Sequence, residues 1–322
     1  MKKYLLTVLS LSIIFLFVLT NVTAAEEFEI GISQFVEHPS LDIAREGFID
    51  QLADEGFIEG ENLKVDLQNA QADFSTAQTI AQRFNQKNLD LVLAVATPSA
   101  QTTANVISDT PVLITAVTDP VEAGVVDSME KPGANVTGTT DMNPVAKQLE
   151  LIKDFLPELK TIGILYNPGE VNSVVQVDLA KAKAEEMGVN IEEGTVSNSS
   201  EVSLAVSSLI GSVDAIYVPT DNIIVSAMPT VLQTAHNNQI PVFASENNSV
   251  KQGAIATLGI DYYQLGRQTG SMAARILNGA DPAAMEVESS EELKLYINKK
   301  SAAEIGLEIP AELLEAADTI FE

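Results

Sequence analysis

Four polar turns carry the side chains best suited to hold a small molecule, and each follows a short apolar run. They are residues 96–104 (ATPSAQTTA), 116–124 (AVTDPVEAG), 166–173 (YNPGEVNS) and 219–222 (PTDN). No turn among the four contains Lys, Arg or His. A phosphate or a dicarboxylate normally recruits at least one Arg or Lys. Hydroxyls, backbone amides and a carboxylate suit a ligand with one carboxylate and one amine, which favours a monocarboxylic amino acid.

The turn at 96–104 is suited to the carboxylate of such a ligand. Ser99 is expected directly before a helix, where serine is a good N-cap. The free N–H groups of Ala100 and Gln101, at the positive end of that helix, can bind a carboxylate. Ser99 can equally serve only to cap its own helix, and the sequence leaves both interpretations open. Thr118, in the next turn, can donate a hydroxyl hydrogen bond.

The two later turns offer groups for the other end of the ligand. Asp221 can accept hydrogen bonds from an ammonium group if its turn faces the same cleft, and its alternative role is again that of a helix N-cap. Asn172 and Ser173 are candidates for polar contacts within the cleft.

Motifs for catalysis or metal binding do not occur in this sequence. It contains no G-x-G-x-x-G, P-loop, G-x-S-x-G or H-E-x-x-H pattern. The chain has two histidines, His38 and His236, and no cysteine, so no metal site is indicated. The formal net charge of −27 repels nucleic acid. We therefore expect a binding protein and not an enzyme, with no cofactor, no metal and no nucleic-acid partner.

Short apolar runs alternate with amphipathic stretches, which predicts an α/β fold. The same order of strand-like and helical stretches occurs twice along the chain, so we expect two Rossmann-like doubly wound lobes with a cleft between them. The strands expected in the first half are 28–33, 63–67, 91–96 and 111–116, and those in the second half are 161–166, 191–196, 215–219 and 241–244. The helices expected between them are 39–55, 74–85, 174–187 and 201–210.

The last part of the chain does not fit a single lobe, so we expect its elements to be shared between the two. We assign residues 26–141 and 254–282 to the first lobe, and residues 142–253 and 283–322 to the second. Three crossings would then form a three-stranded hinge that bends as a unit. The candidate crossings are 140–143, 248–253 and 281–284.

The N-terminus predicts export. Lys2 and Lys3 precede an apolar run that is shorter than the roughly 20 residues of a membrane span, and small residues follow at 22–25. This pattern is typical of a cleaved signal peptide, which we place at residues 1–25. A chain without cysteine offers no site for a lipid anchor, so we expect the mature protein in the periplasm, as a monomer.

The sequence also resembles a known family over nearly the whole mature chain. It is similar to the ABC-transporter substrate-binding proteins of the tryptophan/tyrosine-binding type. This resemblance implies a type I periplasmic-binding-protein fold, a partner permease with its ATPase, and an aromatic or other hydrophobic amino acid as ligand. The segments that carry it are SQFVEHPSLD (33–42), ATPSAQ (96–101), AVTDPVEAG (116–124), NVTGTTD (135–141), YNPGEVNS (166–173), PTDN (219–222) and IATLGIDYYQLGRQTG (255–270).

Family membership would give the polar turns specific roles. By this resemblance, Ser99, Ala100 and Thr118 hold the carboxylate of the ligand, and Asp221 holds its amine. The residues implied to line the cleft are Phe35, Glu37, Asn172, Ser173 and Asp261. The ligand would bind the first lobe, and closure of the second would complete its contacts.

Two other functions fit the same fold. The protein could present its ligand to a chemoreceptor or a kinase as a periplasmic sensor, or it could be a periplasmic hydrolase that uses the carboxylates of the cleft. Neighbouring genes or a pull-down would identify a sensor, and recovery of candidate ligands unchanged would count against a hydrolase.

Overall fold

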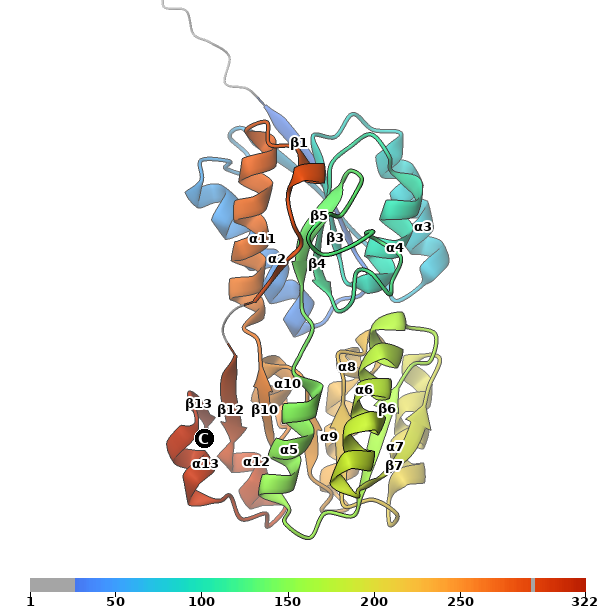
Figure 1. Cartoon of the computed structure of the whole chain (residues 1–322), viewed down its shortest axis with the longest axis vertical. Coiled ribbons are helices and arrows are strands. Elements are labelled where there is room, and N and C mark those ends of the chain that lie inside the picture. Colours follow the sequence, from blue (N-terminus) through green and yellow to red (C-terminus); the bar gives the residue numbers. More distant parts are fainter. Residues whose placement is uncertain (1–26, 291–292) are drawn as a thin grey trace, which may run out of the picture.

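A computed structural model describes residues 27–290 and 293–322, which form two α/β lobes stacked along the longest axis (Figure 1). The expected signal peptide at 1–25 lies outside the described residues. Within the described ranges, no helix combines the length and the apolar character needed to cross a bilayer.

The first lobe contains a six-stranded parallel sheet in the order β11-β5-β4-β3-β1-β2. Strands β3 and β4 are buried along their whole length, as expected for a parallel sheet covered on both faces. The strands are β1 (Phe28–Gln34), β2 (Leu63–Asn69), β3 (Leu91–Val95), β4 (Val112–Val117), β5 (Val136–Thr140) and β11 (Glu288–Ser289). The helices are α2 (Pro39–Asp54), α3 (Phe74–Asn85), α4 (Thr97–Val106), α11 (Tyr262–Leu277) and the 3₁₀ turn η2 (Pro282–Ala284).

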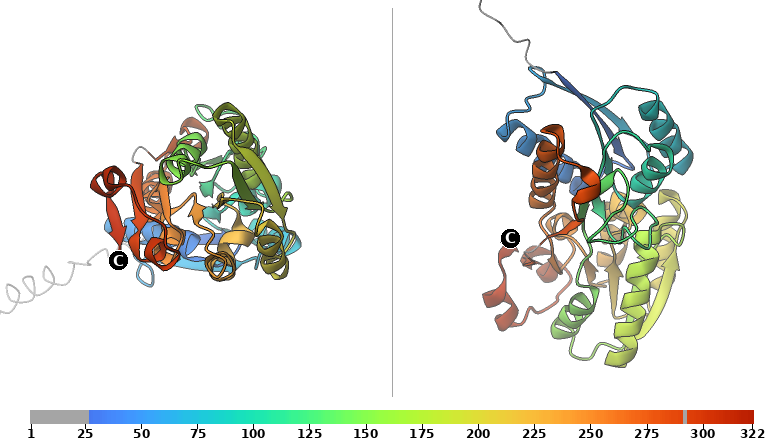
Figure 2. Two further views of the ribbon diagram at one scale, coloured as in Figure 1. Left: turned by 90° about the horizontal axis from the view of Figure 1, so that it is seen from below. Right: turned by 45° about the horizontal axis from the view of Figure 1, so that its top comes forward.

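Helices α2 and α11 pack side by side on one face of this sheet, although about 200 residues of chain separate them (Figures 1 and 2). Two glycines permit the close contact. A Cβ at Gly266 would lie 1.9 Å from the carbonyl oxygen of Ala44, and one at Gly47 would lie 2.2 Å from that of Tyr263. Their packing fixes the N-terminal ends of both helices at the edge of the lobe that faces the second lobe.

The second lobe contains a four-stranded parallel sheet in the order β7-β6-β8-β9 and a smaller sheet in the order β10-β12-β13. The strands are β6 (Thr161–Tyr166), β7 (Asn190–Thr195), β8 (Ala215–Val218), β9 (Val242–Ala244), β10 (Ala256–Gly259), β12 (Lys294–Asn298) and β13 (Thr319–Phe321). The helices are α5 (Val145–Phe155), α6 (Val171–Met187), η1 (Ser199–Glu201), α7 (Val202–Leu209), α8 (Asn222–Ser226), α9 (Met228–His236), α10 (Asn247–Gln252), α12 (Lys299–Glu304) and α13 (Ala311–Ala316).

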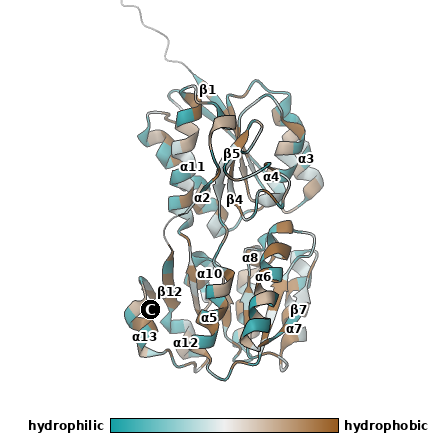
Figure 3. Ribbon diagram, viewed as in Figure 1, coloured by the Kyte–Doolittle hydropathy of each residue, from teal (hydrophilic) through white to brown (hydrophobic). Residues whose placement is uncertain are grey.

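Each lobe has its own hydrophobic core. One cluster of buried side chains fills the first lobe and two fill the second. The helices carry both hydrophobic and hydrophilic residues (Figure 3), as amphipathic helices that cover a sheet do. The expected α/β fold of two doubly wound lobes is confirmed.

The chain passes between the lobes three times, but two of the passages differ from those expected. The first follows β5 and falls at 141–144, close to the expected position, and the others follow β10 and β11. The segment 248–253 instead belongs largely to α10 in the second lobe, and 282–284 form η2 in the first lobe.

Strand pairing accounts for these differences. Strand β10 pairs antiparallel with β12 and therefore lies with the second lobe, whereas the sequence analysis assigned 254–259 to the first. Strand β11 pairs with β5 and therefore extends the first sheet, whereas 283–289 had been assigned to the second lobe. Short strands such as these carry no pattern that identifies their partners.

Candidate ligand-binding site

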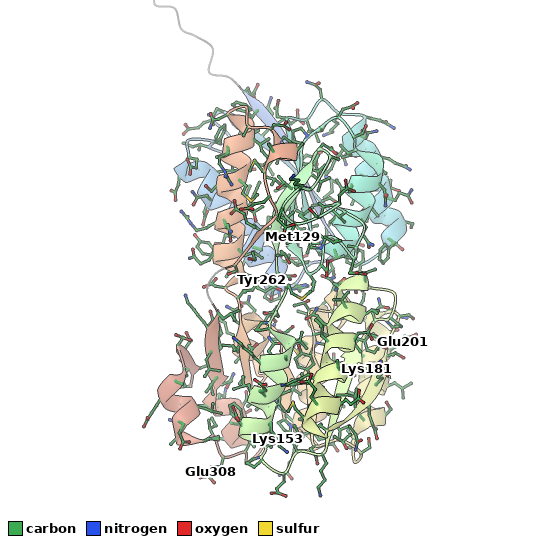
Figure 4. The ribbon with its side chains drawn as sticks, viewed as in Figure 1. Met129, Lys153, Lys181, Glu201, Tyr262 and Glu308 are labelled. Atoms are coloured by element: carbon green, nitrogen blue, oxygen red, sulfur yellow. The ribbon has the colours of Figure 1, made fainter. Side chains whose placement is uncertain are left out.

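A small cavity lies between the two lobes. The first lobe lines it with His38, Ser40, Leu41, Ala116, Thr118, Asp141 and Tyr262, the last of which is labelled at the junction of the lobes in Figure 4. The second lobe lines it with Asn172, Thr220, Asp221, Asn222, Val225 and Glu246.

Direct hydrogen bonds join the lobes around this cavity. The Ser40 hydroxyl donates to Oε2 of Glu246 over 2.6 Å, and the hydroxyl oxygens of Thr118 and Thr220 lie 3.1 Å apart. Ala72 packs against a core cluster of the second lobe, and Val171 packs against the core of the first. The two lobes are therefore closed on each other in this structure.

Carboxyl groups dominate the polar wall. Asp141, Asp221 and Glu246 line the cavity and are buried, and Glu170 is buried behind it. Within the described part of the chain, no Lys or Arg lines the cavity. A ligand group that bears a positive charge therefore finds several acceptors here and no competing cation.

Asp221 is held by neutral donors from two neighbouring turns. Its Oδ1 accepts from the Ile224 N–H over 2.8 Å, and its Oδ2 accepts from the Ser173 hydroxyl over 2.7 Å and from the Asn167 N–H over 2.5 Å. Burial raises the pKa of Asp221, and these hydrogen bonds oppose the rise. Asp221 is thus both the N-cap of α8 and part of the cavity wall, so its two interpretations from sequence are compatible.

Asp141 connects the cavity to the first crossing between the lobes. Its carboxylate accepts from the Tyr262 hydroxyl over 2.5 Å and from the Thr118 hydroxyl over 2.9 Å. Burial raises the pKa of Asp141, again against the effect of these donors. The Thr118 hydroxyl therefore lies at the cavity, as expected, but in the closed form its proton is engaged by Asp141.

Glu246, in the second lobe, is the N-cap of α10. It accepts from the Asn248 and Ser249 N–H groups, from the Ser249 hydroxyl and, across the cleft, from the Ser40 hydroxyl. Burial is the main cause that raises its pKa. The Glu246 carboxyl group therefore both caps the N-terminus of α10 and joins the second lobe to the first by a hydrogen bond.

His38 lies where α2 begins and is buried in the cavity wall. Burial lowers the pKa of His38 to about 4, although nearby Asp42 and a hydrogen bond with Asn222 raise it. The imidazole is therefore neutral at physiological pH. Its Nδ1 has no hydrogen-bond partner in the described part of the chain.

The turn before α4 differs from the sequence prediction. The helix begins at Thr97 and not after Ser99, so the N-cap is Ala96, which offers no side-chain cap. The N-cap role predicted for Ser99 is wrong because Pro98, with its fixed φ, fits the first turn of a helix. Ala96 adopts φ 78° and ψ 153°, a region that is almost restricted to glycine.

Ser99 and Ala100 are fully buried in this turn and do not line the closed cavity. The Ser99 hydroxyl has no hydrogen-bond partner among the described residues. The turn touches the cavity wall through Thr97, whose hydroxyl accepts from the Thr118 N–H over 3.4 Å. Ser99 therefore lies two residues after Thr97, which contacts Thr118.

Of the remaining predicted residues, Asn172 lines the cavity. Ser173 does not line it but donates a hydrogen bond to Asp221, which does. Phe35 is buried against Phe74, with ring centroids 5.3 Å apart. Glu37 is exposed and faces a separate open groove.

Asp261 caps α11 by accepting from the Tyr263 and Gln264 N–H groups. The structure therefore brings Thr118, Asn172, Ser173 and Asp221 together, but Ser99, Ala100, Phe35, Glu37 and Asp261 do not line the closed cavity.

The sequence analysis missed Asp141 and Glu246 as wall residues, and it did not single out Ser40 or Tyr262. Asp141 directly follows β5 and Glu246 comes two residues after β9. Ligands gather at the carboxyl ends of parallel strands, so the same rule that selected the four turns would have found both carboxyl groups.

The family model described as "ABC transporter substrate binding protein" matches residues 29–321 of this chain. The chain belongs to this family. Substrate-binding proteins of ABC transporters act outside the cytoplasm. The substrate-binding protein is also 48% identical over 279 residues to a "Tyrosine-binding protein" of Clostridioides difficile, covering 87% of this chain and 81% of that relative.

Two solved structures support the closed arrangement of the substrate-binding protein. A Streptococcus pneumonia "ABC domain in complex with L-Trp" is 40% identical, with a TM-score of 0.89 and coverage of 92% of this chain and 100% of that one. The "ligand-free, open structure" of a Clostridium difficile substrate-binding protein is 46% identical, with a TM-score of 0.68 and coverage of 91% and 99%. The less identical relative has the more similar shape, so lobe arrangement accounts for the difference.

Proposed function

We propose that this substrate-binding protein captures an aromatic α-amino acid by lobe closure and delivers it to an ABC permease driven by a cytoplasmic ATPase. The observation that carries the proposal is a closed cavity walled by Asp141, Asp221 and Glu246, with no Lys or Arg among the described lining residues. An ammonium group in such a cavity forms charge-assisted hydrogen bonds in a setting of low dielectric constant, where they are strong.

The two ends of the ligand require different partners. We assign its ammonium group to the side of Asp221 and Asn172, and its carboxylate to the turn before α4. That helix begins without a side-chain cap, so its first free N–H groups can donate hydrogen bonds to a carboxylate. Ser99 offers an unpartnered buried hydroxyl there, and Thr118 would turn its hydroxyl from Asp141 to the ligand.

The side chain of the ligand is assigned from relatives and from the wall. One relative is named a tyrosine-binding protein, and another was solved with L-Trp. Leu41, Ala116 and Val225 give the cavity apolar surface beside its carboxyl groups. An aromatic amino acid matches this mixture of apolar and acidic surface.

We further propose that residues 1–25 direct export to the periplasm and are removed, and that the mature protein works as a monomer. The first lobe then comprises the six-stranded sheet, the second comprises the four-stranded and three-stranded sheets, each with its covering helices, and the three crossings act as the hinge.

Calorimetry on the purified protein tests the proposal. L-tyrosine and L-tryptophan should bind, whereas tyramine (no carboxylate) and 3-(4-hydroxyphenyl)propionate (no ammonium) should bind at least about 30-fold more weakly, since each leaves buried groups unpaired. Equal binding of L-tyrosine and its deaminated analogue would refute the assignment of the acidic wall. Chemical analysis of the recovered ligand distinguishes binding from hydrolysis.

A further inference from the structure

Glu170 differs from the other buried carboxyl groups around the cavity. Its Oε2 accepts from Asn172 Nδ2 over 3.2 Å and from the backbone and side-chain amides of Asn222, over 3.3 and 2.5 Å. Its Oε1 is buried and has no hydrogen-bond partner in the described part of the chain. Asp221 and Glu246, by contrast, each have both oxygens hydrogen-bonded.

An ionised carboxylate with one bare oxygen is poorly accommodated in a buried site. Burial is the main cause that raises the pKa of Glu170 to about 8, and the negative charge of Asp221 raises it further. Without a ligand, burial and the neighbouring charge of Asp221 therefore favour the protonated form of Glu170.

Two further unpartnered atoms lie on residues that contact Glu170 or its partners. Asn172 donates to Glu170, but its Oδ1 is buried and has no hydrogen-bond partner among residues 27–290 and 293–322. His38 is hydrogen-bonded to Asn222, the other partner of Glu170, and its Nδ1 is likewise buried without a partner in those ranges. His38 and Asn172 both line the cavity. A neutral imidazole nitrogen and an amide oxygen are acceptors, as an ionised carboxylate would be.

We propose that Glu170 ionises as the ligand binds, releasing its proton to solvent, and that its carboxylate with Asn172 and His38 receives the ammonium group. This inference rests on the proposed function, because it assumes an ammonium-bearing ligand. One O–H bond of Glu170 breaks, the proton leaves to solvent, and the ammonium group keeps its three N–H bonds. An ammonium group has three donors, which matches the three unpartnered acceptors.

Other charged groups define the surroundings of this proton. Asp221 is the group whose charge acts on Glu170, and Asp141 and Glu246 contribute further negative charge to the cavity wall. Asp42 acts on His38. A cation introduced among these carboxyl groups lowers the pKa of Glu170, because an opposite charge nearby favours the ionised form.

Proton release makes affinity depend on pH. Between the pKa of Glu170 in the complex and its value of about 8 in the empty protein, affinity should rise by up to about tenfold per pH unit. Above pH 8, Glu170 is already ionised before the ligand arrives, so the rise should level off.

The test is calorimetry with L-tryptophan at pH 7, in phosphate and in Tris, two buffers with different ionisation enthalpies. The wild-type protein should release between about half a proton and one proton per ligand bound. Glu170→Gln, which imitates the protonated carboxyl group, should release none and should show affinity nearly independent of pH from 6 to 8. Glu185→Gln, an exposed change on the same helix, is the matched control and should behave as the wild type.

Each outcome of this experiment bears on the proposal about Glu170 in a defined way. Binding of L-tryptophan to wild type without proton release overturns this inference and leaves the proposed function intact. Release that persists in Glu170→Gln assigns the proton to another group and also overturns it. If Glu170→Gln does not fold, the slope of wild-type affinity from pH 6 to 8 decides, and a flat profile refutes the proposal. Absence of binding by every amino acid overturns the proposed function itself.

Discussion

The turn after β3 and the turn after β8 occupy equivalent positions in the two lobes but have opposite electrostatic character. Helix α4 begins at the first turn with Ala96 as its N-cap and no side-chain cap. Helix α8 begins at the second turn with Asp221, whose carboxylate accepts from the Ile224 N–H. An uncapped helix N-terminus attracts a negative group, whereas a buried capping carboxylate attracts a positive one. The choice of one residue at the same place in two similar lobes can thus create two ends for a zwitterion.

The two turns also differ in how firmly they are held. Asp221 is fixed by three donors, so its position is set before a ligand arrives. The Ser99 hydroxyl has no partner among the residues that the structure describes, and Ala96 is in a strained conformation. Strain of this kind persists where the surrounding structure enforces it, and it clusters at functional sites. The turn before α4 therefore has a polar group that still lacks a hydrogen-bond partner among the described residues. In the turn before α8, the Asp221 carboxylate already has its partners.

Removing the charge at the α8 turn should have the largest effect. Asp221→Ala should weaken binding of L-tryptophan by about 30-fold or more, because a buried charge-assisted interaction lost on one side costs about 2–5 kcal/mol. It should also lower stability, since the N–H groups of Asn167 and Ile224 lose their acceptor. Asp221→Asn is the control that keeps the size and a capping oxygen. An unchanged dissociation constant in calorimetry would show that Asp221 does not contribute to ligand binding.

The α8 turn is also held by His38, and acid should loosen it. The pKa of His38 is lowered to about 4 in the folded protein, below its ordinary value of 6.5, so the stability that neutral His38 contributes is present above pH 6.5. It should be lost as pH falls from 6.5 to about 4, by about 3 kcal/mol, because the unfolded chain then binds a proton that the folded chain does not. Urea unfolding at pH 7.5 and 4.5 measures the loss. His38→Gln should lack this part of the pH dependence, and equal slopes in both proteins would contradict the prediction.

The α4 turn is tested by Ser99→Ala. If the Ser99 hydroxyl binds the ligand carboxylate, the change should weaken affinity by about 10-fold or more, because one hydrogen bond to a charged group contributes about 1.5–3 kcal/mol. Stability should barely change, because the hydroxyl has no partner among the described residues. Thr103→Val removes a second unpaired hydroxyl of the same helix and should change neither affinity nor stability. Equal affinities for both variants would place the carboxylate elsewhere.

The smallest effect is expected from relief of strain at the α4 turn. Ala96→Gly should raise the free energy of unfolding by about 1 kcal/mol, because glycine adopts the observed backbone angles without strain. Ala104→Gly, within the body of the same helix, should lower it by about 1 kcal/mol. Thermal unfolding of the two variants measures the contrast. A loss of stability in both would show that the strain at Ala96 is negligible.

Strong local patterns predicted individual elements well. Residues 74–85 and 161–166 have the same bounds in sequence and structure. The first is amphipathic and begins after Asp73, which caps it, and the second is an apolar run between polar turns. These signals lie within the element itself, so no information about distant residues is needed.

The sequence was less informative where position depends on distant partners. It placed the start of α4 after Ser99 because serine is a favourable cap, and it did not weigh Pro98 within the first turn. It treated 140–143 as a crossing and so overlooked Asp141 as part of the cavity wall. The partners of β10 and β11 required knowledge of which sheet edges are free.

Composition and periodicity by themselves determined that the chain is an acidic α/β protein with two similar halves, and that the four polar turns lack Lys and Arg. Those properties are local, because they follow from residue types and their spacing. Only the tertiary structure decided that Thr118, Asn172 and Asp221 share one cavity and that Asp141 and Glu246 complete it. It also decided that one oxygen of Glu170 is buried without a hydrogen-bond partner in the described ranges. Burial and the loss of water at the meeting of two lobes create these features, and neither is a property of any single segment.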